Sequence, residues 1–146
     1  SLINVEGGGM LGMPGVASRV FQTLAEEDVN LIMISQASSE HSICIVCRSD
    51  EATRAVKALQ AALAKELEGA IIHQIDLMPD LEIIAVIGEK MRGKPGMSGR
   101  LFSALGDAEI NVLAIAQGSS ERNISFVIHR SEREAALQTV HRAFLE

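Results

Sequence analysis

Two glutamine side chains end apolar segments that repeat one another along the chain. Gln36 ends an Ile-Ser-Gln segment and Gln117 ends an Ile-Ala-Gln segment, and a small residue and then Ser-Ser-Glu follow each of them. The two glutamines are 117 − 36 = 81 residues apart. A primary amide carries an acceptor oxygen and donor hydrogens, so it can bind an ammonium or a hydroxyl group. Packing explains the repeated apolar residues but not the repeated polar end, which predicts a shared binding role.

A proline–glycine pair precedes each of two predicted helices, within the loop residues 13–15 and 94–96. The first amides of a helix have no intrahelical partner, so a carboxylate can bind there. Glycine lets the backbone approach a ligand closely, and proline suits the first position of a helix. Asn30 and Asn111 follow the same two helices and offer a second amide in each half of the chain.

The 81-residue shift extends over most of the chain. It carries Met10 onto Met91 and Arg19 onto Arg100, and no gap is needed from Ile3 and its partner Ile84 through residues 63 and 144. A repeat this long indicates a duplicated structural unit. We therefore expect two small modules, residues 1–79 and residues 80–146.

The hydrophobic pattern predicts the same order of elements in both modules. Expected strands cover residues 2–6, 31–35, 43–47, 71–77, 81–87, 111–116 and 123–129. Expected helices start near residues 16, 49, 97 and 131, where Ser49 or Asp50 caps the second and Ser131 with Glu134 forms a capping box for the last.

This order predicts an α+β fold of two ferredoxin-like modules, each with an antiparallel sheet and two helices on one face. The first module reads βαββαβ. The second has no residues left for its last strand, which would leave an unpaired sheet edge. We expect that edge to be covered by a strand upstream of Ser1 or by another chain.

Composition argues against several classes of function. The net charge is −6, aromatic residues make up 3% of the chain, and no basic run stands out, so nucleic-acid binding is not expected. No apolar run reaches the roughly 18 residues that span a bilayer, and no signal peptide is recognisable. Two cysteines without a framework pattern fit a reducing, cytoplasmic compartment. Because the chain starts with Ser beside a strand, we expect an excised fragment of a longer protein.

Two motifs point to other chemistry without sufficient support. Gly7-x-Gly9-x-x-Gly12 matches a dinucleotide-binding fingerprint, but the second module loses the middle glycine, and a hairpin rather than a parallel strand follows. Cys44 and Cys47 form a C-x-x-C, but residues three apart in a strand point to opposite faces, so a structural role is expected. No metal, cofactor or catalytic constellation is predicted from the scattered histidines, His41, His73, His129 and His141.

The order βαββαβ, with a Pro-Gly loop before the first helix and Asn at the start of the second strand, resembles the ACT domain. Residues 2–7, 12–21, 34–42 and 114–125 resemble the tandem ACT regulatory region of aspartate kinases, in wording nearest to those fused to homoserine dehydrogenase. The resemblance covers essentially the whole chain. It implies binding of threonine, or next lysine, with feedback inhibition of a kinase domain that this sequence does not contain.

The resemblance also implies a set of binding residues and partners. Gln36 and Gln117 match a family glutamine that contacts threonine, and Asn30 and Asn111 match an asparagine that lines the effector site. A homodimer through the ACT modules is expected, and in this family the strand that completes the second module comes from upstream of the first. The expected effector-binding residues are Gln36, Gln117, Asn30, Asn111, Met13, Pro14, Gly15, Lys94, Pro95 and Gly96.

Simpler explanations remain open for part of this set. From the residues alone, turn structure could also explain the repeated glutamines. The serine pairs with Glu40 and Glu121 fit turn structure better than ligand contact. An asparagine after a helix can instead end that helix in the left-handed conformation. Arg19 and Arg100 fit surface charges. The chain could also be a module that only dimerises, or the regulatory subunit of another amino-acid enzyme, whereas catalysis by the chain itself is not expected.

Overall fold

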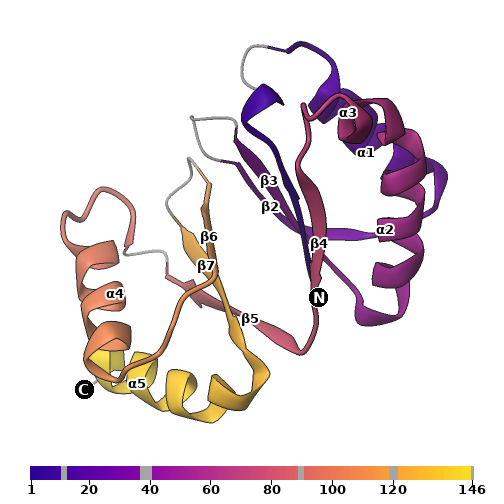
Figure 1. Cartoon of the computed structure of the whole chain (residues 1–146). Coiled ribbons are helices and arrows are strands. Elements are labelled where there is room, and N and C mark those ends of the chain that lie inside the picture. Colours follow the sequence, from indigo (N-terminus) through magenta and orange to yellow (C-terminus); the bar gives the residue numbers. More distant parts are fainter. Residues whose placement is uncertain (11–12, 37–40, 89–90, 119–121, 146) are drawn as a thin grey trace. The chain divides into compact units, whose positions relative to one another are not determined.

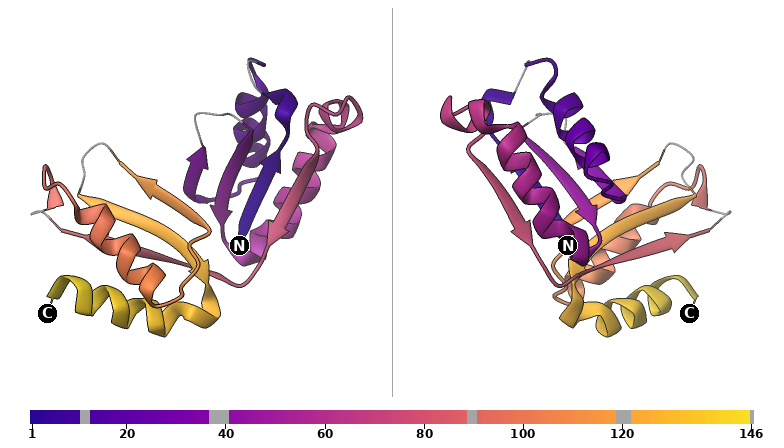
Figure 2. Two further views of the ribbon diagram at one scale, coloured as in Figure 1. Left: turned by 60° about the vertical axis from the view of Figure 1, so that its left-hand side comes forward. Right: turned by 90° about the vertical axis from the view of Figure 1, so that its right-hand side faces the viewer.

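The computed structural model describes residues 1–10, 13–36, 41–88, 91–118 and 122–145. The chain divides into two compact units, Ser1–Pro79 and Asp80–Glu146 (Figure 1). Each unit consists of one antiparallel sheet with helices on one of its faces, as Figure 2 shows from two further sides. This arrangement confirms the predicted α+β fold.

Unit 1 contains a four-stranded sheet in the order β2-β3-β1-β4, with every neighbouring pair antiparallel. Helices α1 and α2 pack against each other on one face of this sheet (Figure 1). In chain order the elements are β1 (Leu2–Glu6), a short 3-10 helix η1 (Gly8–Met10), α1 (Val16–Glu26), β2 (Leu31–Gln36), β3 (Ser42–Cys47), α2 (Ser49–Ala62), α3 (Ala64–Glu68) and β4 (Gln74–Met78).

The core of unit 1 follows from the spacing of its apolar residues. On α1 they recur every four residues, which places them on one face of a helix, and on β1 they recur every two residues, which places them on one face of a strand. The chain leaves α1 through Asp28, whose φ of 54° turns the backbone away from the helix. Fully or nearly fully buried members of this core include Ile3, Val5, Val16, Val20, Leu24, Ile43, Ile45, Ala55 and Leu59.

Unit 2 repeats this arrangement with fewer elements. Among the strands that the structure describes, its sheet has the order β5-β7-β6, and β5 pairs with β7 alone. The aromatic rings of Phe102 and Phe126 meet edge to face in its core, with centroids 6.4 Å apart. The elements are β5 (Leu81–Ile87), α4 (Met97–Asp107), β6 (Ala114–Gln117), β7 (Asn123–His129), a 3-10 turn η3 (Arg130–Glu132) and α5 (Arg133–Leu145).

The predicted helix caps are wrong. Arg48 is the N-cap of α2, without a side-chain cap bond, and Ser49 instead receives a hydrogen bond from the Ser1 hydroxyl at 3.2 Å. Ser131 lies inside the turn η3 rather than at the start of α5. Capping motifs therefore located these helices to within a few residues, but not the groups that satisfy their first amides.

The last strand of unit 1 also starts later than predicted, at Gln74 instead of Ile71. The amides of Ile71 and Ile72 both donate to the carbonyl oxygen of Glu66, at 2.9 and 3.0 Å. Ala70 precedes them in a left-handed conformation with φ of 56°. These apolar residues therefore close the end of α3 instead of extending the sheet.

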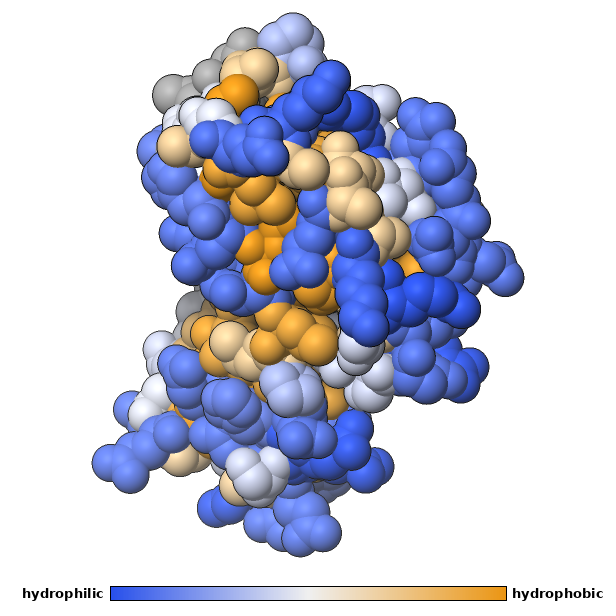
Figure 3. Space-filling view, turned by 45° about the vertical axis from the view of Figure 1, so that its right-hand side comes forward, coloured by the Kyte–Doolittle hydropathy of each residue, from blue (hydrophilic) through white to orange (hydrophobic). Residues whose placement is uncertain are grey.

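Some apolar side chains reach the surface. On the face drawn in Figure 3, exposed apolar groups are bordered by polar side chains. Ile34 on β2 and Ile115 on β6 stand 115 − 34 = 81 residues apart, and both are 44% exposed. Of the helices that the structure describes, none is both long and apolar enough to cross a membrane.

Candidate functional site

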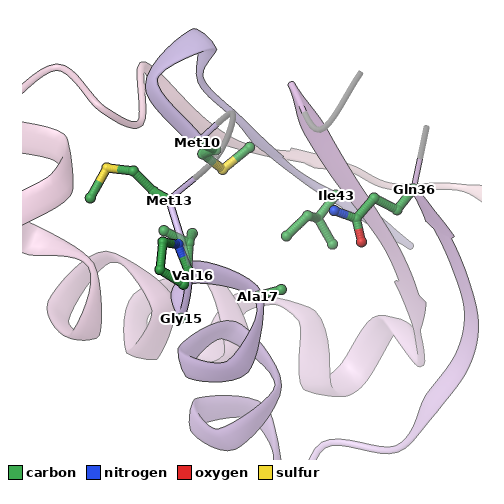
Figure 4. Close-up of a pocket in the computed structure, with 8 residues that line it drawn as sticks. Met10, Met13, Gly15, Val16, Ala17, Gln36 and Ile43 are labelled. Carbon is green, nitrogen blue, oxygen red and sulfur yellow. The ribbon is translucent and has the colours of Figure 1, made fainter. Parts of the chain in front are cut away.

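A pocket opens in unit 1 where the end of β2 lies beside the start of α1 (Figure 4). Its volume is about 480 Å³, within the range of small-molecule sites. Three of the predicted binding residues from the loop, together with Gln36, belong to its lining. The full lining is Met10, Met13, Pro14, Gly15, Val16, Ala17, Gln36 and Ile43.

The register of the sheet places Gln36 in this pocket. Gln36 pairs with Ile43 on the neighbouring strand β3, and directly opposed residues of an antiparallel pair share a face. Ile43 is buried in the core beneath the helices, so Gln36 lies on the helix-bearing face. Figure 4 shows its amide reaching from the end of β2 toward Ile43 and the first turn of α1.

The start of α1 provides the opposite wall. Gly15 is the N-cap with φ of 97° and ψ of −12°, which with the preceding proline matches a type II turn. The first intrahelical donor is Arg19, whose amide binds the Gly15 carbonyl at 3.0 Å. The amides of residues 16–18 therefore lack intrahelical partners and carry the positive end of the helix dipole. Pro14, predicted to begin the helix, lies in the turn before it.

Unit 2 contains the same arrangement in a larger pocket of about 740 Å³. Gln117 pairs with Ile124, Gly96 is the N-cap of α4 with φ of 89°, and the Arg100 amide binds its carbonyl at 2.9 Å. The backbone frame of the pocket is thus duplicated along with the sequence. The lining is Met91, Gly93, Lys94, Pro95, Gly96, Met97, Ser98, Gly99, Gln117 and Gly118.

The side chains on this shared frame differ in polarity. Lys94 of the second pocket occupies the position of Met13, and Ser98 occupies the position of Ala17. The described lining of both pockets contains no Asp or Glu. The described lining of the first pocket is therefore neutral and mainly apolar, whereas that of the second includes a cation and a hydroxyl.

Asn30 and Asn111 line neither pocket. Asn30 precedes the first residue of β2, whereas Gln36 is its last residue, so the structure does not bring the two amides together within unit 1. The helix-ending alternative for Asn30 and Asn111 is wrong, because the left-handed residues after α1 and α4 are Asp28 and Glu109.

The two asparagines instead make the same backbone contact. The backbone N–H of Asn30 donates to Oε2 of Glu51 at 3.2 Å, and the backbone N–H of Asn111 donates to Oε1 of Glu132 at 3.5 Å. The acceptors are also 132 − 51 = 81 residues apart. Both asparagine side chains are exposed, so a ligand contact through them stays a prediction.

The glycines of the dinucleotide-like motif have a packing role. A Cβ on Gly7 would lie 2.1 Å from the Ile71 carbonyl oxygen, and one on Gly9 would lie 2.7 Å from the Ile71 Cα. Glycine is needed here because the loop before the pocket touches the backbone of the segment that precedes β4. Gly12 lies outside the described residues, as do the serine pairs with Glu40 and Glu121.

The duplicated arginines are more than surface charges. Arg19 forms an ion pair with Glu66, whose side chain is 10% exposed. Arg100 instead places its guanidinium 5.4 Å from the ring centroid of Phe144. The repeat could not reveal either partner, because Glu66 has no counterpart 81 residues later within the chain and Phe144 corresponds to Leu63.

The remaining candidates for chemistry do not form a further site among the described residues. Cys47 belongs to the core and Cys44 lies on the other face, where its thiol donates to Oδ1 of Asn4 at 3.4 Å. Burial raises the pKa of both thiols, which disfavours the reactive thiolate. In the part of the chain that is described, no three metal-ligating side chains come together.

Comparison with known proteins gives a consistent family. The sequence model of the ACT domain matches residues 3–63 and 84–144. The chain is 45% identical over 144 residues to bifunctional aspartokinase/homoserine dehydrogenase 1, chloroplastic, of Arabidopsis thaliana. It is 41% identical over 145 residues to the bifunctional aspartokinase/homoserine dehydrogenase of Haemophilus influenzae. These matches cover 99% and 98% of this chain, which spans 16% and 18% of the relatives' lengths.

A solved structure agrees over nearly its whole length. The ligand-free regulatory subunit of aspartate kinase from Thermus thermophilus has a TM-score of 0.81 and is 31% identical to this chain. The match covers 98% of this chain and 91% of that one. The similarity therefore concerns a regulatory part of these proteins.

Proposed function

The chain belongs to the ACT domain family and contains two ACT units like those of aspartate kinase regulatory regions, and from this premise we propose that it senses an amino acid. The effector is an end product of the pathway that starts from aspartate, threonine first and lysine next. Its binding inhibits the kinase domain of a longer parent protein.

One observation carries this proposal: each unit sets a glutamine amide opposite a glycine-capped helix start across a pocket of ligand size. A free amino acid has a carboxylate, an ammonium and one side chain. The carboxylate suits the unpaired amides at the helix start, and the glutamine oxygen suits the ammonium. The loop residues 13–15 and 94–96 complete the proposed contacts.

Threonine fits the described lining better than lysine does. Its methyl group would pack against apolar side chains such as Val16 and Ile43, and its hydroxyl can exchange hydrogen bonds with the Gln36 amide. A lysine side chain brings a second ammonium, and the described lining offers it no carboxylate. Buried cations without partners are unfavourable.

The proposal includes partners beyond the ligand. The equivalent exposed isoleucines Ile34 and Ile115 stand on edge strands, where a second copy of the chain can pack, so a homodimer through the ACT units is proposed. A strand from outside the described chain would complete the sheet of unit 2 beside β5. Typical coupling between an effector site and a catalytic site amounts to about 1–3 kcal/mol.

Two further points stay predictions. Asn30 and Asn111 remain candidate contacts through their exposed amides. A cytoplasmic location also remains a prediction, because the Arabidopsis relative is named chloroplastic and the Haemophilus relative is bacterial.

A thermal-shift screen with all twenty amino acids tests the proposed function. A ligand at about 100 times its dissociation constant stabilises the folded state by about 2.7 kcal/mol, so threonine should raise the melting temperature clearly. The matched control is the double variant Gln36→Ala, Gln117→Ala, which should stay folded and lose the response. Folded protein that responds to neither threonine nor lysine would refute the proposal.

A second candidate is an ACT module that dimerises without a ligand of its own. The exposed edge-strand isoleucines favour it. Sedimentation equilibrium would support this alternative if it showed a tight dimer while calorimetry detected no amino acid. A dimer that tightens with threonine would instead support the sensor.

A further inference from the structure

The two pockets differ in charge at one duplicated position. Met13 and Lys94 stand 94 − 13 = 81 residues apart and both line their pockets. Their backbones are held alike, because the Met13 amide donates to Met10 at 3.1 Å and the Lys94 amide donates to Met91 at 3.2 Å. Equivalent anchoring means that a thioether side chain in one pocket is replaced by an ammonium in the other.

The surroundings of this position reinforce the difference. The loop over residues 8–13 carries no charged residue, whereas the loop over residues 89–94 carries three cations and one anion in its sequence. Within the second pocket, Ser98 and Gly99 replace an alanine and a serine at the first turn of the helix. The second pocket is also larger, at about 740 Å³ against about 480 Å³, so it has room for a hydrated polar side chain.

We propose that Lys94 is a specificity-determining residue, which makes the second pocket reject amino acids with a cationic side chain and favour neutral or acidic ones. The first pocket, with Met13 there, lacks this selection. The inference rests on the proposed function, since it assumes that both pockets anchor the ligand carboxylate at the helix start.

The physical reason is the repulsion of like charges. A side-chain ammonium on the ligand would share the pocket with the Lys94 ammonium and with the positive end of α4, and no carboxylate of the described lining separates them. Two unit charges about 4 Å apart in water change an equilibrium about five-fold. Lys94 is exposed, so water and salt screen the effect, which should weaken as ionic strength rises.

A reciprocal exchange in the full chain tests this. The Gln117→Ala background keeps the glutamine of the first pocket only, and the Gln36→Ala background keeps that of the second only. Calorimetry then measures the dissociation constants of L-threonine, L-lysine and L-glutamate in each background. In the second pocket, Lys94→Met should raise the affinity for free lysine, relative to that for glutamate, by about five-fold or more at low salt. In the first pocket, Met13→Lys should lower the affinity for free lysine, relative to that for glutamate, by a similar factor.

Arg92→Met is the matched control, because Arg92 lies in the same loop but not in the pocket lining. It changes the charge of the loop equally and should leave the ratio of lysine to glutamate unchanged. The inference would be overturned if threonine still binds but Lys94→Met leaves the ratio of lysine to glutamate affinity unchanged. It would also be overturned if Arg92→Met shifts that ratio as much as Lys94→Met does. Folded chains that bind none of the three amino acids would overturn the proposed function together with the inference.

Discussion

The two units share the frame of their pockets but differ in what supports it. In both, a glutamine ends an edge strand opposite a helix that begins after a Pro-Gly turn. In unit 1 residues 64–78 contain α3 and β4, and no equivalent of these two elements occurs among the described residues of unit 2. The proposed binding role therefore rests on the pocket features that both units share, and the contacts of residues 64–78 concern the packing of unit 1.

Two contacts of unit 1 depend on that extra segment. The loop glycines Gly7 and Gly9 touch the backbone at Ile71, and Arg19 pairs with Glu66. In unit 2 the position of Gly9 is occupied by Lys90, and Arg100 lies over Phe144. Substitutions at duplicated positions should therefore have unequal effects in the two units wherever the segment is involved.

The largest difference is expected at the first glycine of the loop. Gly7→Ala would place a methyl group 2.1 Å from a backbone carbonyl oxygen, whereas Gly88→Ala would meet only the flexible side chain of Met91 at 3.2 Å. Gly7→Ala should lower the free energy of unfolding by about 3 kcal/mol or more, and Gly88→Ala by less than about 1 kcal/mol. Urea titrations followed by circular dichroism measure both, and equal losses would contradict the packing role of Gly7.

A smaller difference is expected for the duplicated arginines. Arg19→Met leaves the carboxylate of Glu66 buried without its cation, whereas Arg100→Met removes one cation–π contact. The expected losses of unfolding free energy are about 2–3 kcal/mol for Arg19→Met and about 0.5–1 kcal/mol for Arg100→Met. The first value lies below that of a fully buried pair because the Arg19 side chain is 43% exposed. Differential scanning calorimetry would contradict the ion-pair account by giving the larger loss for Arg100→Met.

The smallest difference is expected where both units make the same contact. Glu51 and Glu132 accept a hydrogen bond from the backbone N–H of Asn30 and of Asn111, respectively. Glu51→Ala and Glu132→Ala should each cost about 0.5–1.5 kcal/mol of unfolding free energy and should agree with each other. Chemical denaturation of the two variants side by side checks this, and a loss confined to one unit would show that the duplicated contact is not equivalent.

The repeat and its apolar periods were sufficient to predict the order of the strands and helices and the placement of Gln36 at a strand end beside a helix start. Those features depend on local patterns that recur every two or four residues. The patterns did not predict every boundary, because β4 begins at residue 74 rather than 71 and β6 covers residues 114–117 rather than 111–116. The Glu66 ion pair and the approach of Gly7 to Ile71 could not be predicted, because they join residues far apart in sequence. The lining residues Met10 and Ile43 were also missed, although the strand register that brings Ile43 beside Gln36 follows from the same alternation.

The central claim is that Gln36 and Gln117 hold an amino acid against a helix start. Isothermal titration of the intact chain with threonine tests it most directly, using Gln36→Ala, Gln117→Ala and the double variant. Loss of one hydrogen bond to a charged group costs about 1.5–3 kcal/mol, so each single variant should lower the threonine affinity of the pocket that loses its glutamine at least ten-fold. The double variant should bind no threonine within the measured range. Threonine binding of unchanged affinity and stoichiometry in a folded double variant would contradict the account.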